Sequence, residues 1–526
     1  MRTIWQSLAW KEWHEHKWKL LSLTIVLCAV NFLCMINGID WQGVTESLMA
    51  MTLCCSIPLA VFVGASTAAS ERARHTLAYM HAQPTSLRPV AAFKLLAGLL
   101  TVSIPICLTY MFDFACFAIA GDGQIPSHSS HIIFNSPFNF DVPYFNWYLE
   151  GSLAISLISA SIFLWTAACG VNRSDEVSAA AWGVLAMVIC WTVVGLTASN
   201  LDARWLKEDG YWIANSFKAS LPGGVATIGN SDAWRKAPTV LGVPTPIAAG
   251  ILVHAGLAYW FTTRFGRNAE SLVRSQRAVR KLANKPYWLG PPSHNPLTAI
   301  VWKQAREVAP LGIAGLAFVV GIVCLVVVTR GADIGIRAIS QFSAGATVTV
   351  GILVALVAGI GTMLYDTNPK LNTFWRSRPI NPDLWFWTKF VTGLVVIFST
   401  LYIPVLLFAL AVDGPEYVTT LLSDRESMLF PAITVGLYIA AVTMTALVRH
   451  AVYAAILSIA ILYLGPLLVE TGSTLFHRYF LDEPSRPFFS AESGPLMAIA
   501  MGVVVFATLI LGWLAVRYDW GRKSRY

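Results

Sequence analysis

Charged side chains are scarce in this chain of 526 residues. Asp, Glu, Lys and Arg together make up only 13% of it, whereas hydrophobic residues make up 56%. Apolar runs of about 18 residues or more are typical of transmembrane helices, because about 20 helical residues cross the hydrocarbon core. The alternating ten-residue segments of a membrane barrel are missing. The composition excludes an ordinary soluble domain and predicts an all-α polytopic membrane protein.

The chain also lacks the short motifs that carry common chemistry. It contains no G-x-x-x-x-G-K-[ST] loop for nucleotide phosphates, no G-x-S-x-G turn and no H-E-x-x-H pair. His128 and His131 share a loop with Asp122 and Asp141, a set more typical of an ordinary loop than of a metal site. The nine cysteines form no C-x-x-C pair, and their apolar surroundings favour small core residues. We therefore predict no catalytic residue, cofactor or metal on this chain.

Basic residues outnumber acidic ones, giving a net charge of +8. When the apolar runs are placed as membrane spans, 27 of the 37 Lys and Arg residues fall on one side of the membrane. This asymmetry is the positive-inside bias, so it indicates orientation in the bilayer and not binding to nucleic acid. We expect a multi-pass protein of the plasma (inner) membrane with both termini in the cytoplasm.

Twelve apolar runs are long enough to be spans. External loops are expected at 121–146, 200–239 and 470–494, and the aromatic 200–239 segment favours short helices that dip towards the outer interface. The predicted spans lie at about 20–39, 48–70, 90–120, 147–171, 177–199, 240–263, 310–329, 341–364, 390–412, 429–448, 451–469 and 495–516.

One charged segment recurs in the two halves with the same spacing. Glu71 lies 13 residues before Pro84 and 23 before Lys94. In the second half, Asp366 lies 13 residues before Pro379 and 23 before Lys389. We therefore predict two parallel six-helix repeats, because an even number of crossings preserves orientation. The units are 1–264 and 296–526, joined by a basic cytoplasmic linker at 265–295.

The segment before the first span of each unit is rich in Trp and charge. These segments, about 3–18 and 296–309, predict amphipathic helices lying in the membrane interface, where Trp rings and basic side chains are favoured. Their candidate interface residues are Trp10, Lys11, Glu15, Trp302, Lys303 and Glu307.

Few ionisable residues fall inside the spans. Asp113 and Asp413 are expected near the outer surface, and His254 is expected to be a neutral, hydrogen-bonded histidine. An ionisable group inside a membrane span suggests function by default, because charge is costly there. Without an array of buried carboxylates, however, the sequence shows no machinery for ion-coupled transport.

The recurring charged segments have two interpretations. Each can be a helix-end ion pair in a loop that sets membrane orientation, or a rigid cytoplasmic elbow on which a partner protein pushes. Fixed spacing favours the elbow, because a loop that only sets orientation needs charge but not distance. The candidate elbow residues are Glu71, Arg72, Arg74, Pro84, Lys94, Asp366, Arg376, Pro379 and Lys389.

These features resemble the membrane-spanning permease of a type-2 ABC exporter (the ABC-2 family). The first copy matches the family pattern in its Glu71-x-x-x-x-Thr76-Leu77 motif, followed by Pro84 and Lys94. The second departs from it, since Asp replaces Glu and Asn372-Thr373-Phe374-Trp375 stands where Thr-Leu is expected.

The resemblance implies short re-entrant helices before the sixth span and a separate ABC ATPase that binds ATP and Mg²⁺. It also implies that ATP-driven movement reaches the elbows and interface helices, so that the halves rock and substrate moves outward. One chain would carry both six-span units of the usual dimer, with a homodimer or accessory subunits left open, and the substrate cannot be read.

Two other classes stay open. A secondary transporter of the major-facilitator type also has two six-span halves, but Ala-Ser-Glu-Arg-Ala-Arg fits its G-x-x-x-D-R-x-G-R loop poorly. A membrane-embedded enzyme would need His, Asp or Glu clustered at one membrane face, and no such cluster is visible.

Overall fold

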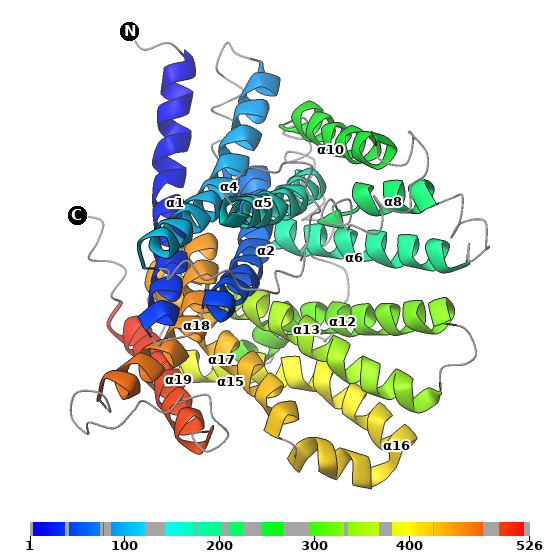
Figure 1. Cartoon of the computed structure of the whole chain (residues 1–526). Coiled ribbons are helices and arrows are strands. Elements are labelled where there is room, and N and C mark those ends of the chain that lie inside the picture. Colours follow the sequence, from blue (N-terminus) through cyan, green and yellow to red (C-terminus); the bar gives the residue numbers. More distant parts are fainter. Residues whose placement is uncertain are drawn as a thin grey trace. The chain divides into compact units, whose positions relative to one another are not determined.

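The computed structural model describes most of the chain as helices (Figure 1). Every regular element among the described residues is helical, which confirms the all-α class. Internal contacts divide the chain between Arg277 and Ala278 into two compact units, each considered by itself below. The described residues are 4–36, 41–73, 77, 86–120, 143–171, 173, 176–200, 211–224, 244–266, 295–330, 335–364, 366–367, 381–423, 425–476 and 494–519.

The first unit contains six long helices and a short one. Helix α2 is at its centre, packed against α4, α5 and α6, while α1 lies along α4 and α8 packs on α10 (Figure 1). The helices are α1 (Ile4–Ile36), α2 (Trp41–Ala73), α4 (Leu87–Ala120), α5 (Pro143–Gly170), α6 (Glu176–Asn200), α8 (Tyr211–Ser220) and α10 (Pro244–Arg264).

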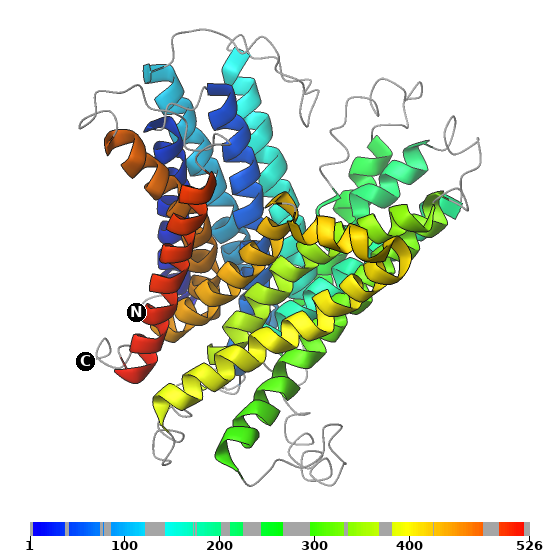
Figure 2. The ribbon, with the colours of Figure 1, turned by 90° about the horizontal axis from the view of Figure 1, so that it is seen from below.

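The second unit repeats this packing. Helix α13 contacts α12, α16 and α17, α17 contacts α18 and α19, and α12 lies along α15. Figure 2 shows α15 and α16 in yellow as one long path, interrupted by the π-helical segment η3. The elements are α12 (Pro296–Arg330), α13 (Ile336–Leu364), α15 (Pro382–Ile397), η3 (Phe398–Tyr402), α16 (Ile403–Ser423), α17 (Arg425–Val448), α18 (Ala451–Phe476) and α19 (Gly494–Arg517).

Two glycines, 295 residues apart, make the central helix contact of each unit. A Cβ on Gly64 of α2 would lie 2.8 Å from the carbonyl oxygen of Phe163 on α5. A Cβ on Gly359 of α13 would lie 3.0 Å from the carbonyl oxygen of Tyr438 on α17. Small residues let helix backbones approach closely in membranes, so both units bring these two helices together in the same way.

A second pair of glycines with the same spacing receives the same aromatic side chains. A Cβ on Gly98 of α4 would lie 2.5 Å from the ring of Phe163, and a Cβ on Gly393 of α15 would clash with the hydroxyl group of Tyr438. Both rings are fully buried. One aromatic residue therefore locks three helices together in each unit, and the 295-residue spacing extends beyond the charged segments.

Seven helices are long and apolar enough to cross a membrane among the described residues. They agree with the predicted multi-pass membrane protein, and each of the twelve predicted spans falls on a helix of the structure. The seven are Leu8–Leu33, Leu87–Ala118, Tyr148–Gly170, Thr245–Arg264, Ile336–Leu364, Pro382–Glu416 and Pro431–Val448.

The predicted separate interface helices were wrong in one respect. The segments 3–18 and 296–309 are helical where described, but each continues without a break into the following apolar run, as α1 and α12. α1 contains neither Pro nor Gly, the residues that most often end a helix. α12 does contain Pro310, which interrupts neither the helix nor its direction along α15.

The N-terminal half of α1 also faces the other way from an interface helix. Its side chains Glu12 and Lys19 are 2% exposed, whereas Trp10, Trp13 and Trp18 are 55–60% exposed. A helix lying on the membrane surface would bury its Trp rings in the lipid and present charge to water. The charges here instead face the interior of the unit, where they have partners described below.

The other predicted segments are described only in part. The 200–239 region contains one short helix, α8, as expected for a segment that is not a free loop. Of the 470–494 region, the first residues continue α18 and Gly494 begins α19. Most of the 121–146 loop and the 265–295 linker lies outside the described residues.

The glycine contact provides a test of the packing with a matched control in one helix. We expect Gly359→Ala to destabilise the protein by about 1–3 kcal/mol, because the added Cβ meets the Ala441 side chain at 2.6 Å. Gly361→Ala has nothing within 4 Å of its Cβ, so it should be neutral or gain up to about 1 kcal/mol from helix propensity. Thermal unfolding in detergent measures both, and equal midpoints for the two variants would contradict this packing.

Candidate functional site

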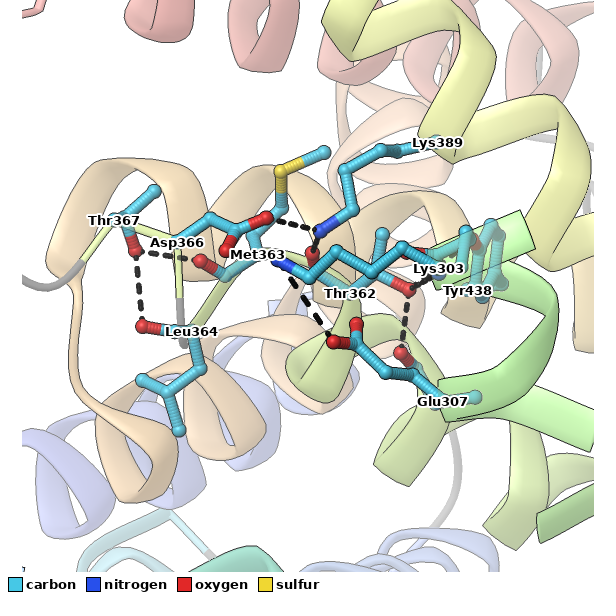
Figure 3. A network of polar contacts seen from close by, with 11 residues as sticks. Lys303, Glu307, Thr362, Met363, Leu364, Asp366, Thr367, Lys389 and Tyr438 are labelled. Carbon is cyan, nitrogen blue, oxygen red and sulfur yellow. Dashed lines mark hydrogen bonds and ion pairs between the residues drawn. The ribbon is translucent and has the colours of Figure 1, made fainter. Parts of the chain in front are cut away.

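The recurring charges of the second unit meet in a buried network (Figure 3). Asp366 follows directly after α13, and each of its carboxylate oxygens binds a different lysine. Lys303 of α12 donates to Oδ1 at 2.6 Å, and Lys389 of α15 donates to Oδ2 at 2.7 Å. Lys389 is 1% exposed and Asp366 is 7% exposed. The network therefore ties together three helices far apart in the sequence.

The end of α13 is held by further hydrogen bonds. Lys389 also donates to the carbonyl oxygen of Thr362 at 2.5 Å, and Gln304 of α12 donates to the Thr362 hydroxyl at 2.8 Å. The last four carbonyl groups of a helix have no partner within it. Lys389 and Gln304 thus fix the last turn of α13 to its two neighbours (Figure 3).

The first unit has an equivalent network at the end of α2. Lys94 of α4 lies 2.9 Å from Glu71 and 2.9 Å from Glu12 of α1. Lys11, also on α1, lies 2.6 Å from the same Glu71 oxygen. All of these side chains except Lys11 are at least 95% buried. The acidic residue of each unit is again held between a lysine of its first helix and a lysine of its third.

One histidine extends the network of the first unit. His16 Nε2 lies 3.6 Å from Glu12, and its Nδ1 lies 2.9 Å from the hydroxyl of Thr101 on α4. That hydroxyl donates to the carbonyl oxygen of Ala97, so the histidine Nδ1–H is the donor to the Thr101 oxygen. The second unit has no counterpart, because the matching position on α12 is Val308, which lies in an apolar cluster.

Formal charges balance in both networks. The first combines Lys11 and Lys94 with Glu12 and Glu71, and the second combines two lysines with Asp366 and the more distant Glu307, 3.8 Å from Lys303. An uncompensated buried charge is costly, but a paired and hydrogen-bonded one is tolerated. Each network is therefore a closed unit that ionises as a whole.

The position of the acids makes the lysines necessary. Glu71 is in the last turn of α2 and Asp366 directly follows α13, where the helix dipole is negative and disfavours a carboxylate. Burial would also favour the protonated form of Asp366. Lys389 and Lys303 outweigh it and hold the pKa of Asp366 below its usual value.

The remaining predicted site residues are only partly placed in these networks. Arg72 lies at the end of α2 and is partly buried, while Glu15 is partly exposed. Trp10 stacks on His14 at 5.0 Å between ring centroids, and Trp302 lies under the Arg306 guanidinium at 5.3 Å. Arg74, Pro84, Arg376 and Pro379 lie outside the described residues.

Sequence reasoning missed Glu12, His16, Gln304 and Thr362. The signal was present in α1, where Glu12, His16, Lys19, Leu23, Val26 and Val30 are all buried and follow helical spacing. Reading the polar residues as a solvated face hid that stripe, because its first turns are charged and only its later turns are apolar.

Two other predictions about isolated ionisable groups have clear outcomes. His254 is hydrogen-bonded as expected, with its ring nitrogens 2.5 Å from the Ser161 hydroxyl and 2.7 Å from the Gly250 carbonyl oxygen. The expected surface position of Asp113 was wrong, because its side chain is fully buried in the first unit. Asp413 is also buried, 3.9 Å from Arg337, and α16 continues past it through a bend at Gly414.

The arrangement indicates mechanical positioning and not chemistry. Each acid is neutralised by lysines, and the described residues contain no group of three His, Cys, Asp or Glu side chains that could hold a metal ion. Burial also prevents these carboxylates from touching a docking partner directly in this conformation. What they do is hold the end of the second helix, and so the start of the loop that follows it.

Comparison with known proteins adds no further constraint on the chain. No protein-family model, curated protein or solved structure matches it.

The two networks predict different sensitivities to loss of the acid. Asp366→Asn leaves Lys389 without an adjacent carboxylate, and breaking a buried ion pair from one side costs about 3–5 kcal/mol. Glu71→Gln should cost less, because Lys94 keeps Glu12. Glu307→Gln, part of a partly exposed pair, should cost at most about 1 kcal/mol. Thermal midpoints in detergent test this order, and an Asp366→Asn variant no less stable than Glu307→Gln would contradict it.

The lowered pKa of Asp366 predicts a defined pH dependence. A carboxyl whose pKa is lower in the folded state stabilises the protein above its unfolded pKa of about 4, and this stabilisation is lost as the pH falls through the lower folded pKa. The difference in thermal midpoint between the unmodified chain and Asp366→Asn should therefore be constant from about pH 5 to 7 and close below about pH 4. A gap that persists unchanged into strong acid would show that the ionised carboxylate is not its source.

Proposed function

We propose that this chain is the membrane-spanning permease subunit of an ATP-driven exporter of the ABC-2 type. In this proposal, α1, α2, α4, α5, α6 and α10 and their six counterparts in the second unit form twelve membrane spans in two parallel repeats. Both termini lie in the cytoplasm, and the membrane is the plasma (inner) membrane. Substrate moves outward by alternating access, driven by a partner.

The observation that carries the proposal is the duplicated charge network. In both units it joins the last turn of the second helix to the first and third helices, through Glu71 with Lys11 and Lys94, and through Asp366 with its two lysines. These are the positions that the family resemblance assigns to the coupling elbows. A force on the loop that follows either acid would move three helices together, because the buried pairs hold their ends as one group.

The partner in this proposal is a separate ABC ATPase that binds ATP and Mg²⁺. The chain itself contains no nucleotide-binding loop, and its networks contain no ligand set for a nucleotide. The lipid bilayer is its other partner. The buried acids are then positioning residues, and contact with the ATPase falls to the loops 74–85 and 368–380 that they anchor.

A proton-coupled secondary transporter is the second candidate function. The observation in its favour is the fully buried Asp113, which the sequence placed near the surface. Such a transporter would need no ATPase partner, and this separates the two candidates experimentally.

Co-purification of the tagged full chain from its native membranes tests the proposal first. We expect an ATPase with a nucleotide-binding loop to be recovered, and ATP hydrolysis in lipid vesicles to depend on the permease. A chain that recruits no ATPase under these conditions would overturn the ABC assignment and favour the secondary transporter.

The elbows have a sharper test. We expect the double variant Glu71→Gln with Asp366→Asn to lose the coupling of ATP hydrolysis to transport while still inserting in the membrane, because both anchored loops lose their rigid support. Gly359→Ala is the matched control, since it disturbs packing by steric contact and leaves every network charge in place. Coupling that survives in the double variant, or is lost equally in the control, would contradict the elbow role.

A further inference from the structure

Asp113 on α4 differs from every other buried acid described. Its side chain has no exposed surface, and neither carboxylate oxygen has a hydrogen-bond partner among the described residues. No basic side chain among them forms an ion pair with it. By contrast, the buried Asp413 of the second unit lies 3.9 Å from Arg337. An ionised carboxylate at Asp113 would be an uncompensated charge, which is among the costliest arrangements in a protein interior.

The groups around Asp113 offer no positive charge. The titratable neighbours whose charges would act on it are Tyr110 and Cys116 on α4, Tyr148 on α5 and Cys28 on α1. No titratable group of α2 or α10 is found to act on it among the described residues. Phenols and thiols are uncharged near neutral pH, so none of these groups stabilises a carboxylate by charge.

Two further polar side chains lie at the same height in the unit. Starting from the charge network, Asn31, Thr52 and Asp113 are each 19 residues along α1, α2 and α4 from Glu12, Glu71 and Lys94 respectively. All three are at most 2% exposed, and Asn31 Nδ2 and Thr52 Oγ1 also have no hydrogen-bond partner among the described residues.

Paired side chains between the two sites support this register on α1 and α4. Cys28 lies beside Thr109, one turn before Asn31 and Asp113 respectively. Since 19 helical residues rise about 28 Å, the three polar residues form a layer near the opposite end of the helices from the charge network.

We propose that this layer is a proton-binding site, with Asp113 carrying the proton at neutral pH. Protonation removes the buried charge and converts one carboxyl oxygen into a donor. The remaining carbonyl oxygen is then an acceptor at the level of the Asn31 amide, which has an unused donor. The step is a simple association, in which a proton from water forms the O–H bond and nothing is oxidised or reduced.

A proton fits this layer better than a metal cation. A cation site would have Asp113 as its single anionic ligand, and the described residues contain no group of three His, Cys, Asp or Glu side chains. Aromatic rings close the surroundings, with Phe114 and Tyr148 at 5.7 Å between centroids and Tyr110 and Tyr148 at 6.4 Å.

The site belongs to the first unit alone. The position equivalent to Asp113, 295 residues further along the chain, is Phe408, and the Thr347 that matches Thr52 donates to the carbonyl oxygen of Ser343. The inference does not rest on the proposed ABC function, because proton binding is measured on the purified chain without ATPase or substrate.

Infrared spectroscopy of the purified full chain in lipid nanodiscs tests the site. The spectrum at pH 7 should contain the carbonyl stretch of a protonated carboxyl group, shifted in heavy water and lost in Asp113→Asn. Asp413→Asn, which removes a buried carboxylate near an arginine, is the matched control and should leave this band unchanged. A band that is absent at pH 7, or present equally in Asp113→Asn, would overturn the proposal.

Stability against pH gives a second, independent readout. A buried carboxyl that keeps its proton stabilises the fold at low pH, and this contribution falls as the pH rises above about 4, where the unfolded chain ionises. The thermal midpoint of the unmodified chain should therefore fall relative to that of Asp113→Asn between about pH 4 and 7. A midpoint raised by Na⁺ or K⁺ in the unmodified chain but not in the variant would identify a cation site and overturn the proton assignment.

If Asp113→Asn does not yield folded protein, Asp113→Glu keeps the carboxyl group. Its carbonyl band should then move in frequency relative to that of the unmodified chain. A band that stays in place would assign the protonated carboxyl to another residue and contradict the proposal.

Discussion

Each unit depends on a carboxylate placed where a helix disfavours it. Glu71 and Asp366 lie at the negative ends of α2 and α13, in buried surroundings, and lysines on two other helices make the charge tolerable. Because buried ion pairs contribute little net stability compared with apolar packing, their value is geometric. They fix which turn of the first and third helices meets the end of the second, and thereby the register of the whole unit.

Packing around this register repeats in detail. Gly64 and Gly98 enclose Phe163 in the first unit, as Gly359 and Gly393 enclose Tyr438 in the second. The aromatic ring fills the space that three helices would otherwise leave, and the glycines permit the close approach that it needs. Charge network and aromatic lock lie on the same helices, so a movement imposed at one is transmitted to the other without a flexible intermediate.

Much of this architecture could be predicted from the sequence. Apolar length placed the helices, and the common spacing of Glu71 and Asp366 from their lysines identified the duplication. What could not be predicted was orientation about the helix axis. Trp-rich, charged segments such as the start of α1 suit an interface helix by composition, and only the partners on α2 and α4 show that Glu12 faces inward. For the same reason distance along the helix suggested a surface position for Asp113, because height in the membrane says nothing of which side a residue faces.

The differences between the units separate shared mechanics from individual function. Both retain the acid between two lysines and the aromatic lock, which any unit of this fold needs to hold its helices. The first unit alone has His16 and Asp113, where the second has Val308 and Phe408 at the matching positions. Burying an unpartnered carboxyl is costly, and an apolar residue at the same place is not, as the second unit demonstrates. A group that costs stability and is unnecessary for the fold is most economically explained by something that it does, which places the functional asymmetry of this protein in its first unit.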